Sequence, residues 1–167
     1  MLFYMEDEPH EVFITVQMSF RENVRKVKAT VKNACGGVAT LFEDGTVECS
    51  GNKKFGGDAG DKKRLLVDVE FIKASNGAFA AKKRDGSVVV WGHVDYGGDA
   101  KSKQAELIDV QFVVGVEFAF AARRCDGTVV CWGYEVDFPK VERECMKVPI
   151  INFCKRFQSH DHIFTVM

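Results

Sequence analysis

The sequence lacks the features that mark several large classes of protein. Its 167 residues contain no run of 18 apolar residues, so we expect no membrane-spanning helix. The stretch MLFYMEDEPHE at the start is acidic and has no basic segment ahead of an apolar one, which fits neither a secretory signal nor an Arg-rich transit peptide. The formal net charge of −1 argues against a general nucleic-acid coat. We therefore expect an intracellular, non-secreted protein, cytoplasmic or inside an organelle after presequence removal.

Motifs that carry chemistry are also missing. The sequence has no G-x-x-x-x-G-K-[ST], no G-x-S-x-G and no H-E-x-x-H. Its six cysteines form no C-x-x-C pair, and without a secretory signal we expect reduced thiols. His160 and His162 could share a face and hold a metal, but no matching third ligand lies nearby, so we prefer a polar loop. The sequence predicts no enzyme, no cofactor and no metal site.

What the sequence does contain is a strict internal repeat of 41 residues. DGTVECSG starts at residue 44, DGSVVVWG at 85 and DGTVVCWG at 126. The same shift brings FGGDA at 55–59 onto YGGDA at 96–100, and AFAA at 78–81 onto the identical stretch at 119–122. A period near 40 with turn signals at fixed positions is typical of the blades of a β-propeller.

Each unit predicts three or four β-strands and at most one short helical turn. In the middle unit we expect strands at Val69–Ala74, Ala78–Lys83 and Ser87–Trp91, and a helical turn between Asp99 and Leu107. The third strand is apolar at successive positions, so both of its faces need cover, which neighbouring units would supply.

An Asp-Gly pair precedes the last strand of each unit and predicts a tight hairpin, because Gly accepts a positive φ and Asp tolerates one. A hairpin centred on Asp126 and Gly127 places Cys131 opposite Ala122 and Cys125 opposite Thr128, so these cysteines should not pair. Trp-Gly pairs then end two strands, and we expect them to seal blades together. The predicted structural residues are Asp44, Gly45, Asp85, Gly86, Asp126, Gly127, Trp91, Gly92, Trp132 and Gly133.

These elements resemble the regulator-of-chromosome-condensation (RCC-type) repeat family. The shared pattern is an apolar strand, a small-aromatic-small-small strand, D-G-[ST]-V, W-G and a glycine-rich loop, and it covers about residues 27–166. The resemblance implies a β-propeller-like fold, atypically short beside the seven blades of better-known members. It also implies binding to macromolecules, since members serve as exchange factors for a small GTPase, chromatin-docking platforms, photoreceptors, ubiquitin-ligase parts and enzyme inhibitors.

We predict an all-β fold, a propeller-type repeat of about four blades of roughly 41 residues, arranged as a small closed ring or an open arc. In a closed ring, a strand at residues 11–16 would pair with one near 163–166. The single domain 1–167 divides into N-terminal strands at about 1–26, units at 27–68, 69–109 and 110–150, and a partial unit at 151–167.

Basic residues around the repeat loops form the candidate partner-binding site, and repeat geometry should bring equivalent loops to one rim. They are Lys53, Lys54, Lys62, Lys63, Arg64, Lys101 and Lys103. A second basic cluster precedes the Asp-Gly turns, namely Lys82, Lys83, Arg84, Arg123 and Arg124. We expect an acidic protein partner, with a merely solvated surface as the alternative. Nucleic acid is not expected, because no aromatic residues interleave with these lysines.

The sequence therefore predicts a non-enzymatic protein-interaction or scaffold module, such as an accessory subunit of a larger assembly. The alternative, which the family resemblance alone implies, is a regulator of a small GTPase or a chromatin-associated propeller.

Overall fold

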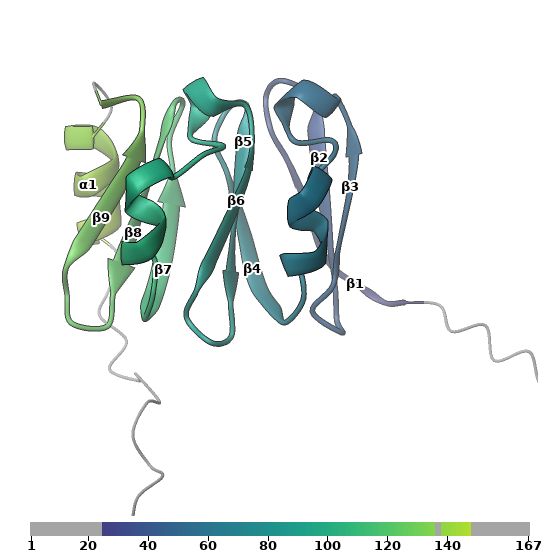
Figure 1. The fold of residues 1–167 in the computed structure, drawn as a ribbon, viewed down its shortest axis with the longest axis horizontal. Coiled ribbons are helices and arrows are strands. Elements are labelled where there is room, and N and C mark those ends of the chain that lie inside the picture. The colour runs from purple at the N-terminus through teal and green to yellow at the C-terminus, as the bar shows by residue number, and fades with distance from the viewer. Residues whose placement is uncertain (1–24, 136–137, 148–167) are drawn as a thin grey trace, which may run out of the picture.

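A computed structural model describes residues 25–135 and 138–147 of the chain. Three antiparallel sheets of three strands each stand side by side in a row, and helix α1 lies at one end of the row (Figure 1). We call the sheets blades 1, 2 and 3. Blade 1 holds β1 (Val27–Lys32), β2 (Gly37–Phe42) and β3 (Val47–Gly51), blade 2 holds β4 (Val69–Ala74), β5 (Ala78–Lys83) and β6 (Val88–Gly92), and blade 3 holds β7 (Val110–Gly115), β8 (Ala119–Arg124) and β9 (Val129–Gly133).

The predicted fold class, mostly β with propeller-type blades, is confirmed. Strands β4 and β5 occupy the predicted ranges, and β6 begins one residue later than predicted, at Val88. The segments 11–16 and 151–167, which would close a ring and supply a fourth unit, lie outside the described residues, as do His160 and His162. Ring closure therefore stays a prediction.

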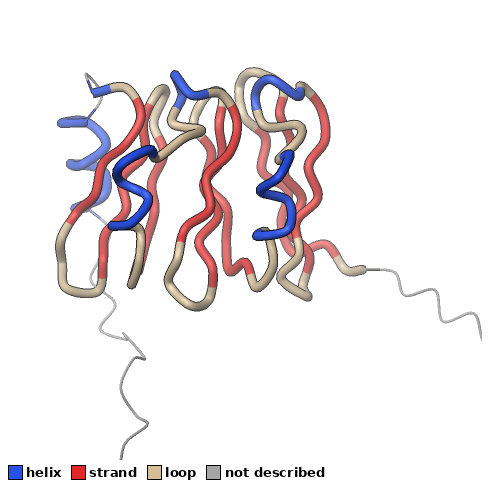
Figure 2. Tube along the Cα trace, viewed as in Figure 1, coloured by secondary structure: helices blue, strands red, loops and turns tan. Residues whose placement is uncertain are grey.

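Short 3₁₀ helices connect the blades along the strand edges (Figure 2). Between β3 and β4 lie η1 (Lys53–Phe55) and η2 (Gly60–Leu65), and between β6 and β7 lie η3 (Val94–Tyr96) and η4 (Lys101–Glu106). The helical turn predicted between Asp99 and Leu107 is thus confirmed as η4.

Adjacent blades share apolar cores. Phe79, Val89 and Trp91 of blade 2 pack on the face of blade 1 that carries Ala39 and Leu41. The same repeat positions of blade 3, including Phe120 and Trp132, pack on the opposite face of blade 2. Each strand of blade 2 is therefore covered on both faces, which explains the unbroken run of buried apolar residues in β6.

Each tryptophan also ties its blade to the preceding linker. The Trp91 indole Nε1 donates a hydrogen bond to the Gly56 carbonyl oxygen at 3.0 Å, and Trp132 Nε1 donates to that of Gly97 at 3.1 Å. The Trp91 ring stacks on Phe79 with 5.2 Å between ring centroids. A buried indole N–H needs such an acceptor, so this bond fixes where the glycine-rich loop passes over the next blade.

Backbone hydrogen bonds join the blades at both edges of the row. At the Asp-Gly edge, the amide of Val110 donates to the Gly86 carbonyl at 2.9 Å. At the opposite edge, the Cys35 amide donates to Asn76 at 2.9 Å, and the Asn76 amide donates to Glu117 at 3.1 Å. The turns of all three blades are thus linked in one chain of bonds.

The Asp-Gly turns differ from the prediction by one residue. Only the glycine is left-handed, with φ of 87° at Gly127, while Asp126 keeps a negative φ. The Arg124 amide donates to Thr128, and the Gly127 amide donates to Arg124, which defines a three-residue loop with a glycine bulge. The register therefore pairs Cys131 with Ala121, not with Ala122 as predicted.

The turn aspartate serves as a side-chain acceptor and not as a second left-handed residue. Asp126 Oδ1 accepts from the Thr128 hydroxyl at 2.6 Å and from the Thr128 amide at 3.0 Å, and these bonds hold the pKa of Asp126 below its ordinary value. Asp44 and Asp85 make the same two bonds with Thr46 and Ser87. The short side chain thus selects the turn in every blade.

Cysteine chemistry partly differs from expectation. Cys35, Cys49, Cys131 and Cys145 are free thiols, so Cys125 and Cys131 do not pair, as predicted. Cys125, however, is disulfide-bonded, and the expectation of reduced thiols is wrong for this residue. Cysteine spacing along the chain does not show which residues folding brings together.

Helix α1 (Phe138–Lys147) is a further departure, since we expected only short helical turns. Phe138, Val141 and Cys145 follow helical spacing and form one apolar stripe, and the last two are fully buried. This stripe packs on Ala119 and Ala121, on the face of blade 3 that points away from blade 2. The helix therefore covers the face on which a further blade would otherwise pack.

Blade 1 ends the row at the other side with a polar face. Blades 2 and 3 contact their preceding neighbours through Phe, Ala, Val and Trp. The 41-residue shift places Val38, Thr40, Glu48 and Ser50 at the same positions of blade 1. Glu48 and Ser50 are exposed, and Glu48 pairs with Arg25. A polar outer face is what a terminal repeat needs, because nothing apolar has to be covered there.

Gly86 and Gly127 offer a matched test of the contact between blades. Both are left-handed, but a Cβ on Gly86 would lie 3.1 Å from the Asp109 Cα, whereas a Cβ on Gly127 meets nothing within 4 Å. We expect Gly127→Ala to cost about 1 kcal/mol of unfolding free energy through backbone strain alone. Gly86→Ala should cost about 1 kcal/mol more, because Asp109 must also shift. Urea unfolding measures both, and equal costs would show that this close approach is not tight.

Candidate interaction surfaces

The predicted basic residues lie on η1, η2 and η4, and we call their side chains the basic linkers. η2 lies against β6 and η4 against β9, on the same side of the row (Figure 1), while η1 lies at the upper edge. Six of the seven predicted residues are exposed, and Lys62 is half-buried. The structure thus brings Lys62, Lys63 and Arg64 together on one turn and repeats that turn one blade further on with Lys101 and Lys103.

Lys62 is held by the fold. Its ammonium Nζ donates to the carbonyl of Val90 at 2.7 Å, and Gln104 Nε2 donates to the carbonyl of Val88 at 2.9 Å. Both carbonyls belong to β6, the outer strand of blade 2, which has a paired neighbour on one side only. Side chains of the linkers thus satisfy an exposed sheet edge, a feature that would otherwise invite strand pairing between molecules.

The remaining basic linkers are more available. Lys103 pairs with Glu106 at 2.9 Å. The other five make no hydrogen bond or ion pair through their side chains within the described residues: Lys53, Lys54, Lys63, Arg64 and Lys101. η2 is anchored at its two ends by buried Ala59 and Leu66, and η4 by buried Ala100 and Leu107, so these charges stand on fixed turns.

The second basic cluster is largely structural. Lys82 and Arg123 occupy equivalent positions and are both buried, at 8% and 3% exposure. Lys82 pairs with Glu70, and the Arg123 guanidinium donates to Gln111 Oε1 at 3.4 Å. Lys83 and Arg124 lie 3.7 and 3.5 Å from the turn carboxylates of Asp85 and Asp126. This cluster therefore stabilises the blades and their turns.

A row of five aromatic rings crosses the upper edge of the molecule, and the sequence analysis missed it. We call it the aromatic row, and it consists of Phe55, His93, Tyr96, Phe118 and Tyr134. Ring centroids are 5.8 Å apart for Phe55 and Tyr96, 5.0 Å for Tyr96 and Phe118, and 6.4 Å for Phe118 and Tyr134. His93 stacks on Phe55 at 5.3 Å. The repeat held the signal, because Phe55 aligns with Tyr96 and His93 aligns with Tyr134.

Gly77 makes room for the aromatic row. A Cβ at this position would lie 2.8 Å from the rings of both Phe55 and Tyr96. One unit later the same position holds Phe118, whose ring stacks on Tyr96. The rings therefore bridge the turns and linkers of neighbouring blades and hold one another in place.

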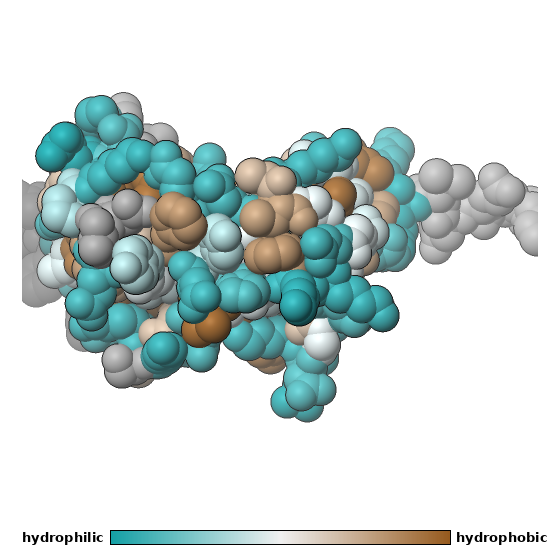
Figure 3. Space-filling view, turned by 90° about the horizontal axis from the view of Figure 1, so that it is seen from above, coloured by the Kyte–Doolittle hydropathy of each residue, from teal (hydrophilic) through white to brown (hydrophobic). Residues whose placement is uncertain are grey.

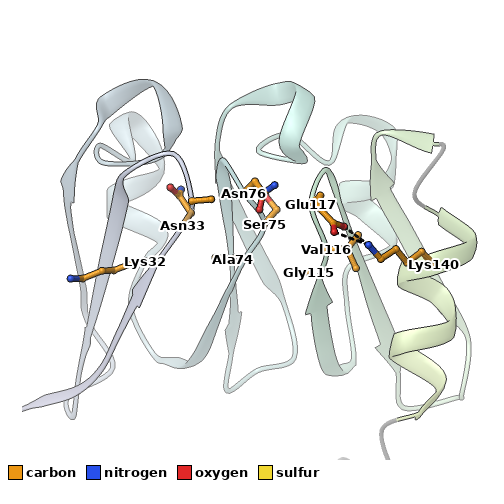
Figure 4. Close-up of a pocket in the computed structure, with 10 residues that line it drawn as sticks. Lys32, Asn33, Ala74, Ser75, Asn76, Gly115, Val116, Glu117 and Lys140 are labelled. Carbon is orange, nitrogen blue, oxygen red and sulfur yellow. Dashed lines mark hydrogen bonds and ion pairs between the residues drawn. The ribbon is translucent and has the colours of Figure 1, made fainter.

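A cavity of about 450 Å³ lies between the turns on the same edge (Figure 4). Its polar groups are already engaged. Asn33 Nδ2 donates to Phe55 at 2.6 Å, Ser75 Oγ donates to Tyr96 at 2.7 Å, and Lys140 pairs with Glu117 at 2.6 Å. The cavity thus has no polar group in these three residues left to orient a small ligand.

The thiols show no sign of activation. Burial raises the pKa of Cys49 and of Cys131 to about 11, and burial also raises that of Cys145. A nucleophilic cysteine needs a lowered pKa, so these three residues serve packing. The described residues contain no group of three or more His, Cys, Asp or Glu placed to hold a metal. No helix in this part of the chain is long and apolar enough to cross a membrane.

The fold defines a short protein of stacked, propeller-type β blades. No family model and no curated protein matches the sequence. Among solved structures, the chain is similar to a chain of the crystal structure of Kap60 bound to yeast RCC1 (Prp20), at a TM-score of 0.49 and 15% sequence identity. The match covers 67% of this chain and 30% of that chain, so this chain spans less than a third of the length of the protein it resembles.

Lys62 and Lys63 separate the structural from the exposed basic residues. We expect Lys62→Met to lower the free energy of unfolding by about 1 kcal/mol, because the Val90 carbonyl loses its donor. Lys63→Met should change it by less than about 0.5 kcal/mol, as is usual for an exposed side chain. Denaturant unfolding of both variants measures the difference. A Lys62 variant as stable as the wild type would mean that the bond to Val90 contributes nothing.

Proposed function

We propose that this chain is a non-enzymatic protein-interaction module that binds an acidic partner protein, as an accessory subunit of a larger assembly. The observation that carries the proposal is the set of five exposed basic linkers without an ion pair in the described residues. They stand on turns that buried residues anchor at both ends. Fixed charges lose little conformational freedom on binding, so more of their attraction contributes to affinity.

The arrangement of the basic linkers supports a protein partner. Blade-to-blade repetition places Lys63 and Arg64 on one turn and Lys101 on the equivalent turn of the next blade. Such spaced, exposed charges steer association and set the orientation of an oppositely charged surface. We accordingly assign binding to Lys53, Lys54, Lys63, Arg64 and Lys101, with Lys103 adjacent, and we assign Lys62 to holding η2 on blade 2.

Charge reversal tests this proposal. The linker variant carries Lys63→Glu, Arg64→Glu and Lys101→Glu, and the control variant carries Lys26→Glu, Arg84→Glu and Arg143→Glu, which are exposed residues outside the linkers. Affinity purification from the cells that express the protein, followed by quantitative mass spectrometry, measures partner recovery. Recovery of an acidic partner should fall at least about fivefold with the linker variant and stay within about twofold with the control.

Two outcomes would contradict the proposal. Equal recovery of the same partners by the wild type and the linker variant would return the basic linkers to a solvated surface. An equal loss in the control variant would show a general charge effect without a defined site. Thermal unfolding of both variants confirms that each is folded before recovery is compared.

A further inference from the structure

We infer that the aromatic row is a docking surface for an extended polypeptide segment that is acidic at one end, aromatic or proline-rich in the middle and basic at the other end. This inference rests on the proposed function, in that the chain binds proteins, but it uses a different surface. The row lies on the edge that Figure 3 views from above, where apolar residues interrupt the hydrophilic surface. Its rings come from η1, η3 and the turns of all three blades.

The exposed end of the row has the properties of an interface. Tyr134 is 57% exposed, Phe118 is 38% exposed, and Val94 beside His93 is 45% exposed. Aromatic side chains are enriched at the centre of protein interfaces, because they bury a large area and lose little conformational freedom. Phe118 is already fixed by its stack on Tyr96, so a partner would meet a rigid ring.

The charges beside the rings differ between the two ends. Lys53 and Lys54 directly precede Phe55 in η1, and both side chains are exposed. At the other end, Asp95 adjoins Tyr96 and Glu135 adjoins Tyr134, and both are exposed. An acidic residue of the partner would therefore sit over η1. A lysine or arginine would sit over Tyr134, where the ring face and the Glu135 carboxylate both attract a cation.

The length of the row fits a short extended segment. Three centroid steps of 5.8, 5.0 and 6.4 Å lead from Phe55 to Tyr134. An extended chain rises about 3.3 Å per residue, so about five residues span this path. Single-stranded nucleic acid also stacks on aromatic rings, but its phosphates would be repelled by the carboxylates of Asp95 and Glu135. The charge pattern therefore favours a polypeptide.

Selection from a display library of random nonapeptides on the full chain tests this inference. Enriched peptides should carry a central aromatic or proline residue, with acidic residues on one side and basic residues on the other. For an enriched peptide, fluorescence anisotropy should show a dissociation constant raised at least about tenfold by the double variant Phe118→Ser and Tyr134→Ser. Ile108→Ser removes an equally exposed apolar side chain outside the row and should change the constant by less than about twofold.

Charge exchange gives the inference its sharpest test. Lys53→Glu with Lys54→Glu should weaken an enriched peptide, and replacing the acidic residues of that peptide with lysine should restore its binding to this variant. The absence of enrichment over the Phe118/Tyr134 double variant, or enrichment of uniformly acidic peptides, would overturn the inference. Binding of single-stranded oligothymidylate that the double variant loses would overturn it in favour of nucleic acid.

The two proposals fail separately. If the peptide selection fails while the Lys63, Arg64 and Lys101 variant still loses an acidic partner, only the aromatic row is wrong. If peptides are selected as described but charge reversal on the linkers changes nothing, the proposal of an acidic partner at the basic linkers is wrong and the docking surface stands.

Discussion

The packing of one blade on the next is the constraint on which the rest of this structure depends. Strands such as β6 are apolar at successive positions, so a single blade has two faces to cover and cannot be stable alone. Phe79 and Trp91 cover one interface, and Phe120 and Trp132 cover the next in the same geometry. The 41-residue period follows from this need, because each unit must present the same face at the same distance along the chain.

A stack of this kind has two end faces, and the chain treats them differently. At blade 1 the positions that elsewhere hold Phe and Trp hold Val38 and Ser50, so the face tolerates water. At blade 3 the face stays apolar, and Val141 and Cys145 of α1 cover it. The linkers then deal with the remaining liability, the outer strand edge, by placing Lys62 and Gln104 on the carbonyls of β6.

The sequence predicted the parts of the structure that the repeat imposes. Strand positions, the glycine-ended turns and η4 recur with the period, so one unit confirms another. The turn register was wrong by one residue, because Asp126 acts through its side chain and only Gly127 is left-handed. Helix α1 was missed because it breaks the repeat, although Phe138, Val141 and Cys145 show helical spacing.

The candidate surfaces were harder to predict, because they depend on contacts between blades. Lys62 and Lys63 are adjacent and identical in sequence terms, yet only Lys62 reaches the Val90 carbonyl. The rings of the aromatic row are up to 79 residues apart in the chain, from Phe55 to Tyr134, and only the stacking of blades lines them up. Composition alone therefore indicated a basic surface but not which of its residues the fold already uses.

The measurement that tests the account most directly is hydrogen exchange, followed by mass spectrometry, on Val141→Asp. Burying a carboxylate in the contact between α1 and blade 3 should detach the helix. If each blade is stabilised mainly by its immediate neighbours, protection should fall in α1 and in β7, β8 and β9, while β1, β2 and β3 keep the protection of the wild type. Equal loss of protection in all three blades, or undiminished protection of α1, would contradict this account.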